Sequence, residues 1–430
     1  MQKKVLIITY YWPPSGGPGV QRWVKFAKYL TRLNVDTYVL TVNPEYATYP
    51  QIDESLFNDI PKDVKVFQTK SFDPYSLYKK VSSNNEVPYG GFVNTKKVDF
   101  KEKALRFIRG NFFIPDSRRG WNRFAIKKAK EIIKSYKIDT IITTGPPHST
   151  QLIGLALKKK TDINWISDFR DPWTDIFYNK LLYPTKITTW INKKLEKKVL
   201  SKSDTVITVS DDLKRLLSEK IADNHGKIKV VSNGYDTDDF TNIIPIEKED
   251  GMLYISYVGT ISDDYTLEGL IEGLDLLDTQ IKAKIRLRFV GKISDNNYKK
   301  FQNAGLANNI ECIGYVKHKI AINYMFSSNI LLLIIPNLNN NKGILTGKLF
   351  EYMASECPIL LIGPTDGDAA KILRTNHQNL ICGYNEPKKI TDYITTMYSE
   401  LQKAEVANPK ISKPTSYSRE SLTKNLLKYI

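Results

Sequence analysis

A lysine and a glutamate lie three residues apart where a loop gives way to a short expected helix. The surrounding stretch, from Asn329 to Gly363, reads as an apolar strand, an Asn- and Gly-rich loop, a helix over Lys348–Ser355 and a second buried strand. Residues three apart share a helix face, so Lys348 and Glu351 can face the same ligand. On these local features alone, an ordinary βαβ unit with a solvated Lys/Glu pair fits equally well.

The start of this helix is suited to an anion. Thr346 is the expected N-cap, and Gly347 allows a phosphate to approach the backbone closely. In a parallel α/β sheet such a loop lies over the carboxyl ends of the strands, and the helix N-terminus presents unpaired N–H groups. We therefore expect a phosphate-binding site at Thr346, Gly347 and Lys348.

Polar residues also follow two expected strands in the first half of the chain. His148 comes after the strand Thr140–Thr144, and Asp168, Arg170 and Asp171 follow the next strand. Two carboxylates around an arginine could bind a polyol or act as acid and base, or they could form an ion-pair cluster that holds the loop. A lone histidine is more often structural than catalytic, so both interpretations of His148 stay open at this point.

A glycine-rich loop separates the first expected strand, Val5–Thr9, from a helix over Val20–Arg32. Its glycines do not form the dinucleotide fingerprint in register, and no acidic residue ends the second strand, so NAD binding is not expected. Gly16 and Gly17 either line a ligand site or make a tight turn.

The bulk properties indicate an ordinary globular protein with a strong positive charge. The 430 residues suffice for two domains, and the three cysteines are too few for a disulfide framework, which indicates a reducing compartment. No apolar stretch reaches the ~20 residues that a membrane span requires, and the N-terminus lacks a cleavage site, so we expect a cytoplasmic protein. The net charge of +17 favours an anionic membrane surface over nucleic acid, for which no binding motif is present.

One segment could meet such a membrane. Phe100–Phe113 can form a basic amphipathic helix with Leu105, Ile108 and Phe112 on one face. A helix that packs on its own domain has the same pattern. The longer stretch from residue 44 to 116 otherwise reads as irregular.

Taken in order, these motifs resemble the retaining glycosyltransferases of family 4, which have the GT-B fold: two Rossmann-like α/β domains facing each other across a cleft. The sequence GKLFEYMA, from Gly347 to Ala354, fits a common variant of the family's donor-binding motif. The resemblance implies that Glu351 hydrogen-bonds the ribose of a sugar nucleotide. Gly343 stands in place of the family's first motif glutamate, and Glu356 stands where the family usually has a glycine after the helix.

The resemblance also assigns roles in the first half. The Pro-Pro-His-Ser turn implies that His148 approaches the transferred sugar, and Asp168 is its expected catalytic companion. The pattern Asp-x-Arg-Asp-Pro-Trp places Arg170, Asp171 and Trp173 on the acceptor side. The loop with Gly16 and Gly17 corresponds to the family's loop near the donor phosphates and the acceptor, and both glycines are expected to bind the donor.

The remaining donor-binding residues follow strands of the second half. The family's phosphate-gripping Arg/Lys pair is replaced by Thr260 and an acidic pair, so Lys292 and Lys348 are the expected substitutes, helped by the backbone of Gly259. Tyr315 and Val316 resemble the segment that contacts the nucleobase.

The resemblance implies three regions. Residues 1–240 form an acceptor-binding Rossmann-like domain, 241–415 form a nucleotide-sugar-binding one, and 416–430 form a helix that crosses back to the first. The polar run Thr241–Gly251 is the expected linker.

The implied reaction moves a sugar from a nucleotide-diphosphate donor, most simply a UDP-sugar, to a hydroxyl of a glycan or polyprenyl-linked acceptor with retention of configuration. No metal or cofactor is expected, because Lys348, Lys292 and the helix N-terminus take up the charge of the leaving diphosphate. The expected setting is surface polysaccharide synthesis, with the protein cytoplasmic and peripheral on the inner face of the membrane. The alternatives are a catalytically degenerate sugar-nucleotide-binding scaffold and an epimerase or phosphorylase of the same fold.

Overall fold

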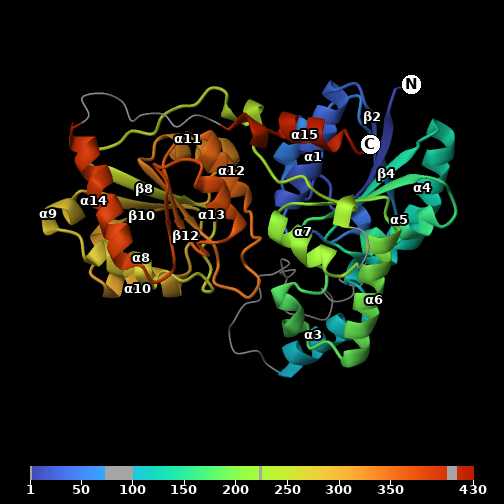
Figure 1. The fold of residues 1–430 in the computed structure, drawn as a ribbon, viewed down its shortest axis with the longest axis horizontal. Coiled ribbons are helices and arrows are strands. Elements are labelled where there is room, and N and C mark those ends of the chain that lie inside the picture. The colour runs from blue at the N-terminus through green and yellow to red at the C-terminus, as the bar shows by residue number, and fades with distance from the viewer. Residues whose placement is uncertain (1, 73–99, 222–224, 404–413) are drawn as a thin grey trace. The chain divides into compact units, whose positions relative to one another are not determined.

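The computed structural model describes residues 2–72, 100–221, 225–403 and 414–430 (Figure 1). The chain forms two compact units: residues 1–232 with 419–430, and residues 233–418. None of the helices within the described ranges combines the length and apolar character that crossing a bilayer requires.

The first unit contains a sheet of seven parallel strands in the order β3-β2-β1-β4-β5-β6-β7. Its strands are β1 (Lys4–Ile8), β2 (Asp36–Val42), β3 (Lys65–Thr69), β4 (Thr140–Gly145), β5 (Asn164–Phe169), β6 (Thr205–Thr208) and β7 (Ile228–Val230). Its helices are α1 (Pro18–Arg32), α3 (Phe100–Phe112), α4 (Asn122–Tyr136), α5 (Ser149–Lys158), α6 (Lys186–Lys202), α7 (Asp211–Ser218) and α15 (Arg419–Leu426).

The second unit contains a sheet of six parallel strands in the order β10-β9-β8-β11-β12-β13. Its strands are β8 (Leu253–Val258), β9 (Ile285–Val290), β10 (Ile310–Gly314), β11 (Ile330–Ile334), β12 (Ile359–Ile362) and β13 (Leu380–Cys382). Its helices are α8 (Glu268–Asp275), α9 (Thr279–Ala283), α10 (Asp295–Asn303), α11 (His318–Phe326), α12 (Gly347–Ala354), α13 (Asp368–Leu373) and α14 (Pro387–Lys403).

Both sheets are buried on both faces, which explains their continuous apolar strands. In β1, Leu6 and Ile8 pack into one core while Val5 and Ile7 pack into the core on the opposite face. Strand β11 divides its residues between two cores in the same way. Strands that are covered on both sides gain burial at every position, so they lack the apolar-polar alternation of half-exposed strands. The expected α/β class with two Rossmann-like halves is confirmed.

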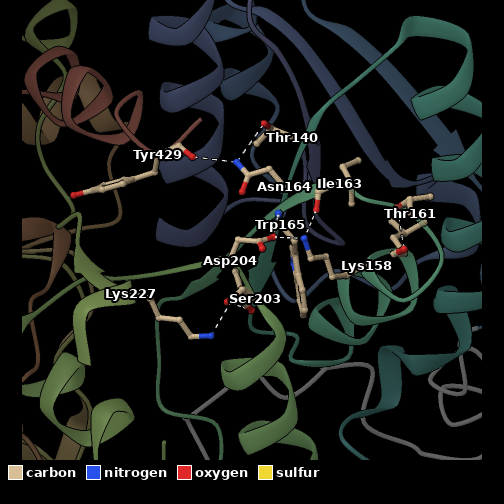
Figure 2. Close-up of polar contacts among 12 residues, drawn as sticks. Thr140, Lys158, Thr161, Ile163, Asn164, Trp165, Ser203, Asp204, Lys227 and Tyr429 are labelled. Carbon is tan, nitrogen blue, oxygen red and sulfur yellow. Dashed lines mark hydrogen bonds and ion pairs between the residues drawn. The ribbon is translucent and has the colours of Figure 1, made fainter. Parts of the chain in front are cut away.

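The C-terminal helix α15 belongs to the first unit. Leu422 and Leu426 are buried in the core that contains residues of α1. Beyond the helix, Asn164 at the start of β5 donates from Nδ2 to the carbonyl oxygen of Tyr429 at 3.2 Å (Figure 2). Asn164 is the first residue of β5, so this hydrogen bond fixes the end of the chain to the amino edge of the sheet.

The same edge carries a second polar contact. Asp204 Oδ2 accepts from the backbone N–H of Trp165 at 2.7 Å and pairs with Lys158 Nζ at 2.8 Å (Figure 2). Lys227 Nζ donates to the carbonyl oxygen of Ser203 at 2.8 Å. These contacts join the starts of β5, β6 and β7, while the carboxyl edge stays available for a site.

The observed units differ in detail from the sequence-based boundaries. The first break falls after Ser232 rather than near residue 240, because Tyr235 is buried in the second unit's core, where its ring packs against Phe240. The sequence analysis expected no strand between residues 44 and 116, yet β3 lies there. Its outer-edge position leaves most of its residues exposed or half-buried, so its apolar signal is weak. Residues 73–99 of that stretch lie outside the described residues.

Glu356 occupies a backbone conformation that favours glycine. It follows the end of α12 with a φ of 61°, in the left-handed region where a residue with a Cβ is strained, and this explains why the family usually has a glycine here.

Replacing this residue by glycine should therefore stabilise the protein. We expect Glu356→Gly to raise the free energy of unfolding by roughly 0.5–1 kcal/mol, because glycine adopts positive φ at little cost and its extra entropy when unfolded offsets only part of that gain. Thermal and denaturant unfolding measure the effect. The neighbouring Ser355→Gly is the matched control and should destabilise, because Ser355 has a φ of −77°. A lower melting temperature for Glu356→Gly would contradict the strain.

Candidate functional site

The strand order places several of the expected site residues at one position in each unit. In the first sheet the order reverses between β1 and β4, and in the second between β8 and β11. Open α/β sheets bind ligands beyond the carboxyl ends of the strands at such a reversal. Gly16 and Gly17 follow β1 and His148 follows β4, while Gly259 follows β8 and the loop to Thr346 follows β11.

At the N-terminus of α12, polar groups are left without a hydrogen-bond partner among the described residues. Thr346 stands at the N-cap position, but its side chain makes no capping hydrogen bond, in contrast to the expected role. Its Oγ1 is buried and has no hydrogen-bond partner in the part of the chain that the structure describes. A Cβ at Gly347 would point into open space, so neither packing nor a positive φ accounts for this glycine. Free N–H groups, an unpaired hydroxyl and an open approach suit an anionic ligand.

Lys348 lies across the end of β8. Its Nζ donates to Tyr257 Oη at 2.6 Å and lies 4.4 Å from the centre of that ring. The lysine stem fits against Gly259, where a Cβ would come within 2.4 Å of the lysine Cε. Burial lowers the pKa of Lys348 to about 8, and nearby Glu351 opposes that shift. The ammonium group is therefore held in a partly dehydrated position and gains most from an added negative charge.

Glu351 has a partner that the sequence analysis did not identify. Its Oε1 lies 2.9 Å from Nε2 of His318, at the start of α11. The second carboxylate oxygen shows no hydrogen bond among the described residues. His318 thus orients one oxygen of Glu351, and the other can accept from a ligand hydroxyl.

The other expected donor residues of the second unit do not join this cluster. Lys292 follows β9 with its side chain exposed, and Tyr315, which is 80% exposed, follows β10 with Val316. Within the described ranges no polar contact links these three residues to Lys348 or Glu351. All of them nevertheless lie at carboxyl ends of strands in the same sheet.

His148 is held by stacking and keeps its polar atoms free. Its ring lies 5.1 Å from that of Trp173 at an interplanar angle of 6°. Neither Nδ1 nor Nε2 has a hydrogen-bond partner among the residues that the structure places, although the side chain is only 8% exposed. Burial, with smaller contributions from Arg170 and Lys220, lowers the pKa of His148 to about 3. The imidazole is therefore neutral at physiological pH and has an unused donor and acceptor.

Asp168 does not have the access that a catalytic contact requires. The residue is fully buried, and its two oxygens accept from Arg22 Nη2 (3.1 Å), Trp23 Nε1 (2.8 Å) and Thr144 Oγ1 (2.8 Å). The geometry therefore gives no direct support to the catalytic role expected from the sequence, which stays a prediction. The alternative of an ion-pair cluster that holds the loop fits the geometry, because the carboxylate joins α1, β4 and β5.

The other residues expected on the acceptor side mostly support the loop. Trp173 is buried, stacks on His148 and donates from Nε1 to Asn192 Oδ1 at 3.0 Å, so a direct acceptor contact is not open to it. Arg170 donates from Nε to Thr144 Oγ1 at 3.1 Å. Burial raises the pKa of Asp171, while Arg170 opposes the shift.

The loop after β1 makes a tight turn. Gly17 has a φ of 102° at the start of α1, and Gly16 donates from its backbone N–H to the carbonyl oxygen of Gln51 at 3.0 Å. The tight-turn interpretation fits Gly17, whereas Gly16 is required by close approach, since a Cβ there would lie 2.9 Å from the Cβ of Asp53.

The sequence analysis missed the residues that hold the expected ones in place. They are Arg22, Trp23, Tyr257 and His318. No local pattern marked any of the four, because their partners come from distant elements.

Comparison with known families agrees with this architecture. Residues 92–239 match the model for Glycosyltransferase Family 4, and residues 239–411 match the model for Glycosyl transferases group 1. Among curated proteins none is a significant match.

Solved structures of similar fold span the whole chain. A glycosyltransferase from Rickettsia africae is 18% identical with a TM-score of 0.57, covering 100% of this chain and 98% of its own. Anabaena HepE in complex with UDP is 13% identical with a TM-score of 0.57 and covers 99% and 98%. A mutant of S. aureus TarM in complex with fondaparinux, alpha-GlcNAc-glycerol and UDP is 11% identical with a TM-score of 0.58 and covers 100% and 99%. The family matches and the shared GT-B fold together show that the chain belongs to the family 4 type of glycosyltransferases.

Proposed function

We propose that this glycosyltransferase moves a sugar, a hexosyl or N-acetylhexosaminyl group, from a nucleotide-diphosphate donor to an acceptor hydroxyl with retention of configuration. The observation that carries the proposal is the set of polar groups at and near the N-terminus of α12. There, among the residues that the structure describes, Thr346 Oγ1 has no hydrogen-bond partner and one carboxylate oxygen of Glu351 accepts no hydrogen bond, while the Lys348 ammonium is partly dehydrated. UDP is the proposed nucleotide, and the UDP in the HepE and TarM structures supports that choice.

In the proposed donor site, the diphosphate lies against the N-terminus of α12. Backbone N–H groups of Gly347 and Lys348, together with the Lys348 ammonium, would stabilise the charge that grows on the leaving phosphate oxygen. Glu351 would accept from the ribose hydroxyls, with His318 holding its orientation. Lys292 and Gly259 would add to the phosphate site, and Tyr315 and Val316 would border the nucleobase.

The chemical step would proceed at one face of the sugar. The bond from the anomeric carbon to the phosphate oxygen breaks while the acceptor oxygen bonds to the same carbon from the same side, which retains the configuration. The acceptor proton passes to the departing phosphate oxygen. His148, as a neutral imidazole, would hydrogen-bond a hydroxyl of the transferred sugar, and Asp168 would act through the loop that it anchors.

A glycan or polyprenyl-linked acceptor is proposed, as expected for surface polysaccharide synthesis. A lipid-linked acceptor would be reached at the inner face of the cell membrane, and the net charge of +17 supports contact with anionic lipid there. We further propose that no divalent metal is needed, because Lys348 and the helix N-terminus supply the positive charge.

Nucleotide binding tests the proposal directly. We expect one of UDP-, GDP-, ADP- and dTDP-sugars to stabilise the protein by about 2.7 kcal/mol at 100 times its dissociation constant, equally with and without EDTA. Glu351→Ala should weaken that ligand by roughly 1.5–3 kcal/mol, because a charge-assisted hydrogen bond is lost. Thermal shift and calorimetry measure both effects, with the exposed Glu272→Ala on α8 as the control. If no nucleotide shifts the melting temperature, the degenerate scaffold becomes the better description.

The pKa of Lys348 predicts how binding depends on pH. A lysine whose pKa is lowered to about 8 loses its proton as the pH rises through that value, so nucleotide affinity should fall between about pH 7 and about pH 9. Lys348→Met should bind more weakly at both values and show little dependence on pH. Calorimetric titration with UDP measures the effect. Equal wild-type affinity at the two pH values would remove Lys348 from the phosphate site.

His148 should matter more for turnover than for donor affinity. We expect His148→Ala to lower kcat roughly tenfold to a hundredfold, as for the loss of a hydrogen bond that is strongest in the transition state, with a smaller change in donor affinity. Because the pKa is about 3, this residue should cause no loss of kcat between about pH 8 and about pH 6. The exposed His377→Ala is the control. Equal losses in kcat and affinity would assign His148 to binding alone.

A further inference from the structure

The first unit carries a concentrated group of exposed apolar side chains. Half of the exposed large apolar residues among those described lie between Phe100 and Trp190, on α3, α6 and the turn before α6. Six of them define what we call the α3–α6 surface: Leu105, Ile108, Phe112, Tyr183, Ile187 and Trp190. Exposure reaches 73% for Phe112, 71% for Ile187 and 57% for Trp190. Scattered apolar residues are normal on a protein surface, but a contiguous group usually marks a binding site.

Polar contacts hold the two helices of this surface together. Asn111 near the end of α3 donates from Nδ2 to the carbonyl oxygen of Tyr183 at 3.0 Å. Its Oδ1 accepts from the backbone N–H of Thr185 at 2.7 Å and from Thr188 Oγ1 at 2.9 Å. Thr185 is the N-cap of α6, so a single side chain links the end of one helix to the start of the other. Figure 1 shows α3 and α6 in the same part of the first unit.

The same elements are rich in exposed lysine. Lys101 and Lys103 lie on α3, and Lys186, Lys193, Lys194 and Lys197 lie on α6. The Lys194 ammonium lies 3.8 Å from the centre of the Trp190 ring. The two acidic residues of these helices are neutralised or buried, since Glu102 pairs with Arg106 at 2.5 Å and Glu196 is 1% exposed. The helices of this surface therefore carry both exposed apolar side chains and exposed lysines, and neither of their own two acidic residues is available to pair with those lysines.

We propose that the α3–α6 surface docks the protein on an anionic lipid bilayer. Phe112, Ile187 and Trp190 would enter the boundary between headgroups and acyl chains, where amphipathic aromatic residues are favoured. The lysines would meet anionic headgroups, and their long stems allow each ammonium to stay in that layer while the stem lies along apolar surface. Binding itself does not depend on sugar transfer. Only its purpose, reaching a lipid-linked acceptor, rests on the proposed function.

The charge of the surface argues against other occupants. Lysine is depleted in protein–protein interfaces, whereas six exposed lysines are present here. A second copy of the chain would bring two strongly basic surfaces face to face, at a cost in repulsion. Nucleic acid would satisfy the lysines but would leave Phe112 and Ile187 in contact with phosphate and water. A bilayer with negative headgroups would pair with the lysines and also remove the apolar side chains from water.

Trp190 provides an internal reporter for the test. The other five tryptophans of the chain are buried, none of them more than 3% exposed. We would titrate the full-length protein with vesicles of phosphatidylcholine alone and with vesicles in which phosphatidylglycerol replaces part of it. Anionic vesicles should shift the tryptophan emission to shorter wavelength, brominated acyl chains should quench it, and the protein should sediment with the vesicles. Neutral vesicles should have little effect. Trp190→Phe should lose the fluorescence change and still sediment.

Two pairs of variants separate the apolar and the basic parts. Phe112→Ser with Ile187→Ser should lower the partition coefficient roughly tenfold or more, because both side chains leave water on binding. Ile244→Ser with Leu276→Ser, which removes exposed apolar residues of the second unit, should leave it unchanged. Lys193→Gln with Lys197→Gln should lower binding to anionic vesicles roughly fivefold for each lysine. Lys299→Gln with Lys388→Gln carries the same change in net charge and is its control.

Three outcomes would overturn the proposal. They are an unchanged emission with anionic vesicles, equal binding by Phe112→Ser with Ile187→Ser, and a concentration-dependent dimer in solution that this variant abolishes. Stabilisation by UDP is measured on the same samples. If the Phe112→Ser with Ile187→Ser variant is still stabilised by UDP but no longer binds the vesicles, docking and donor binding are separate. If UDP does not stabilise the protein while the protein still binds the vesicles, the proposed function is contradicted and the proposed docking surface is supported.

Discussion

Every strand in each of the two sheets runs in the same direction, and this constraint decides where chemistry can occur. All carboxyl ends of a parallel sheet open at one edge, and the chain must leave that edge in opposite directions at the point where the strand order reverses. The loops after β1 and β4, and those after β8 and β11, therefore cannot cover this point completely. Glycines, the Pro-Pro-His turn and the start of α12 occur there, while the opposite edge of the first sheet is closed by contacts such as that between Asn164 and Tyr429 (Figure 2).

The two units use charge in different ways at these edges. In the first, Arg22 and Asp168 form a fully buried pair that joins α1 to β4 and β5, because the carboxylate also accepts from Trp23 and Thr144. Removing either partner would leave a buried charge without its counter-charge, which is strongly destabilising. In the second, Lys348 is only partly compensated by Tyr257 and Glu351, and Thr346 Oγ1 has no hydrogen-bond partner within the described part of the chain. Under the proposed function, the hydrogen-bonded groups position the site and the groups without a protein partner bind the ligand.

The α3–α6 surface adds a feature that the strand order does not explain. Its apolar residues stay exposed, and among the described residues its lysines form no ion pair with an acidic side chain. Under the proposed docking and the proposed acceptor, the enzyme would work next to lipid. The same chain would then hold a sugar nucleotide through dehydrated charges and a membrane through hydrated ones.

Local sequence determined most of the strands, the strand-end motifs and the family, because burial on both faces leaves continuous apolar runs and because the GKLFEYMA motif is short and local. The half-exposed edge strand β3 left no such run. Local sequence also placed His148 after a strand and Lys348 and Glu351 on the helix that follows a strand-end loop. Tertiary structure alone decided which of these side chains can be reached. Asp168 reads like a catalytic carboxylate in sequence, yet Arg22 and Trp23 of α1 cover it. Tyr257, His318 and the pairing of α3 with α6 were likewise invisible, since each depends on elements that are distant along the chain. Secondary structure follows from residue periodicity, whereas access and pairing follow from which element packs on which.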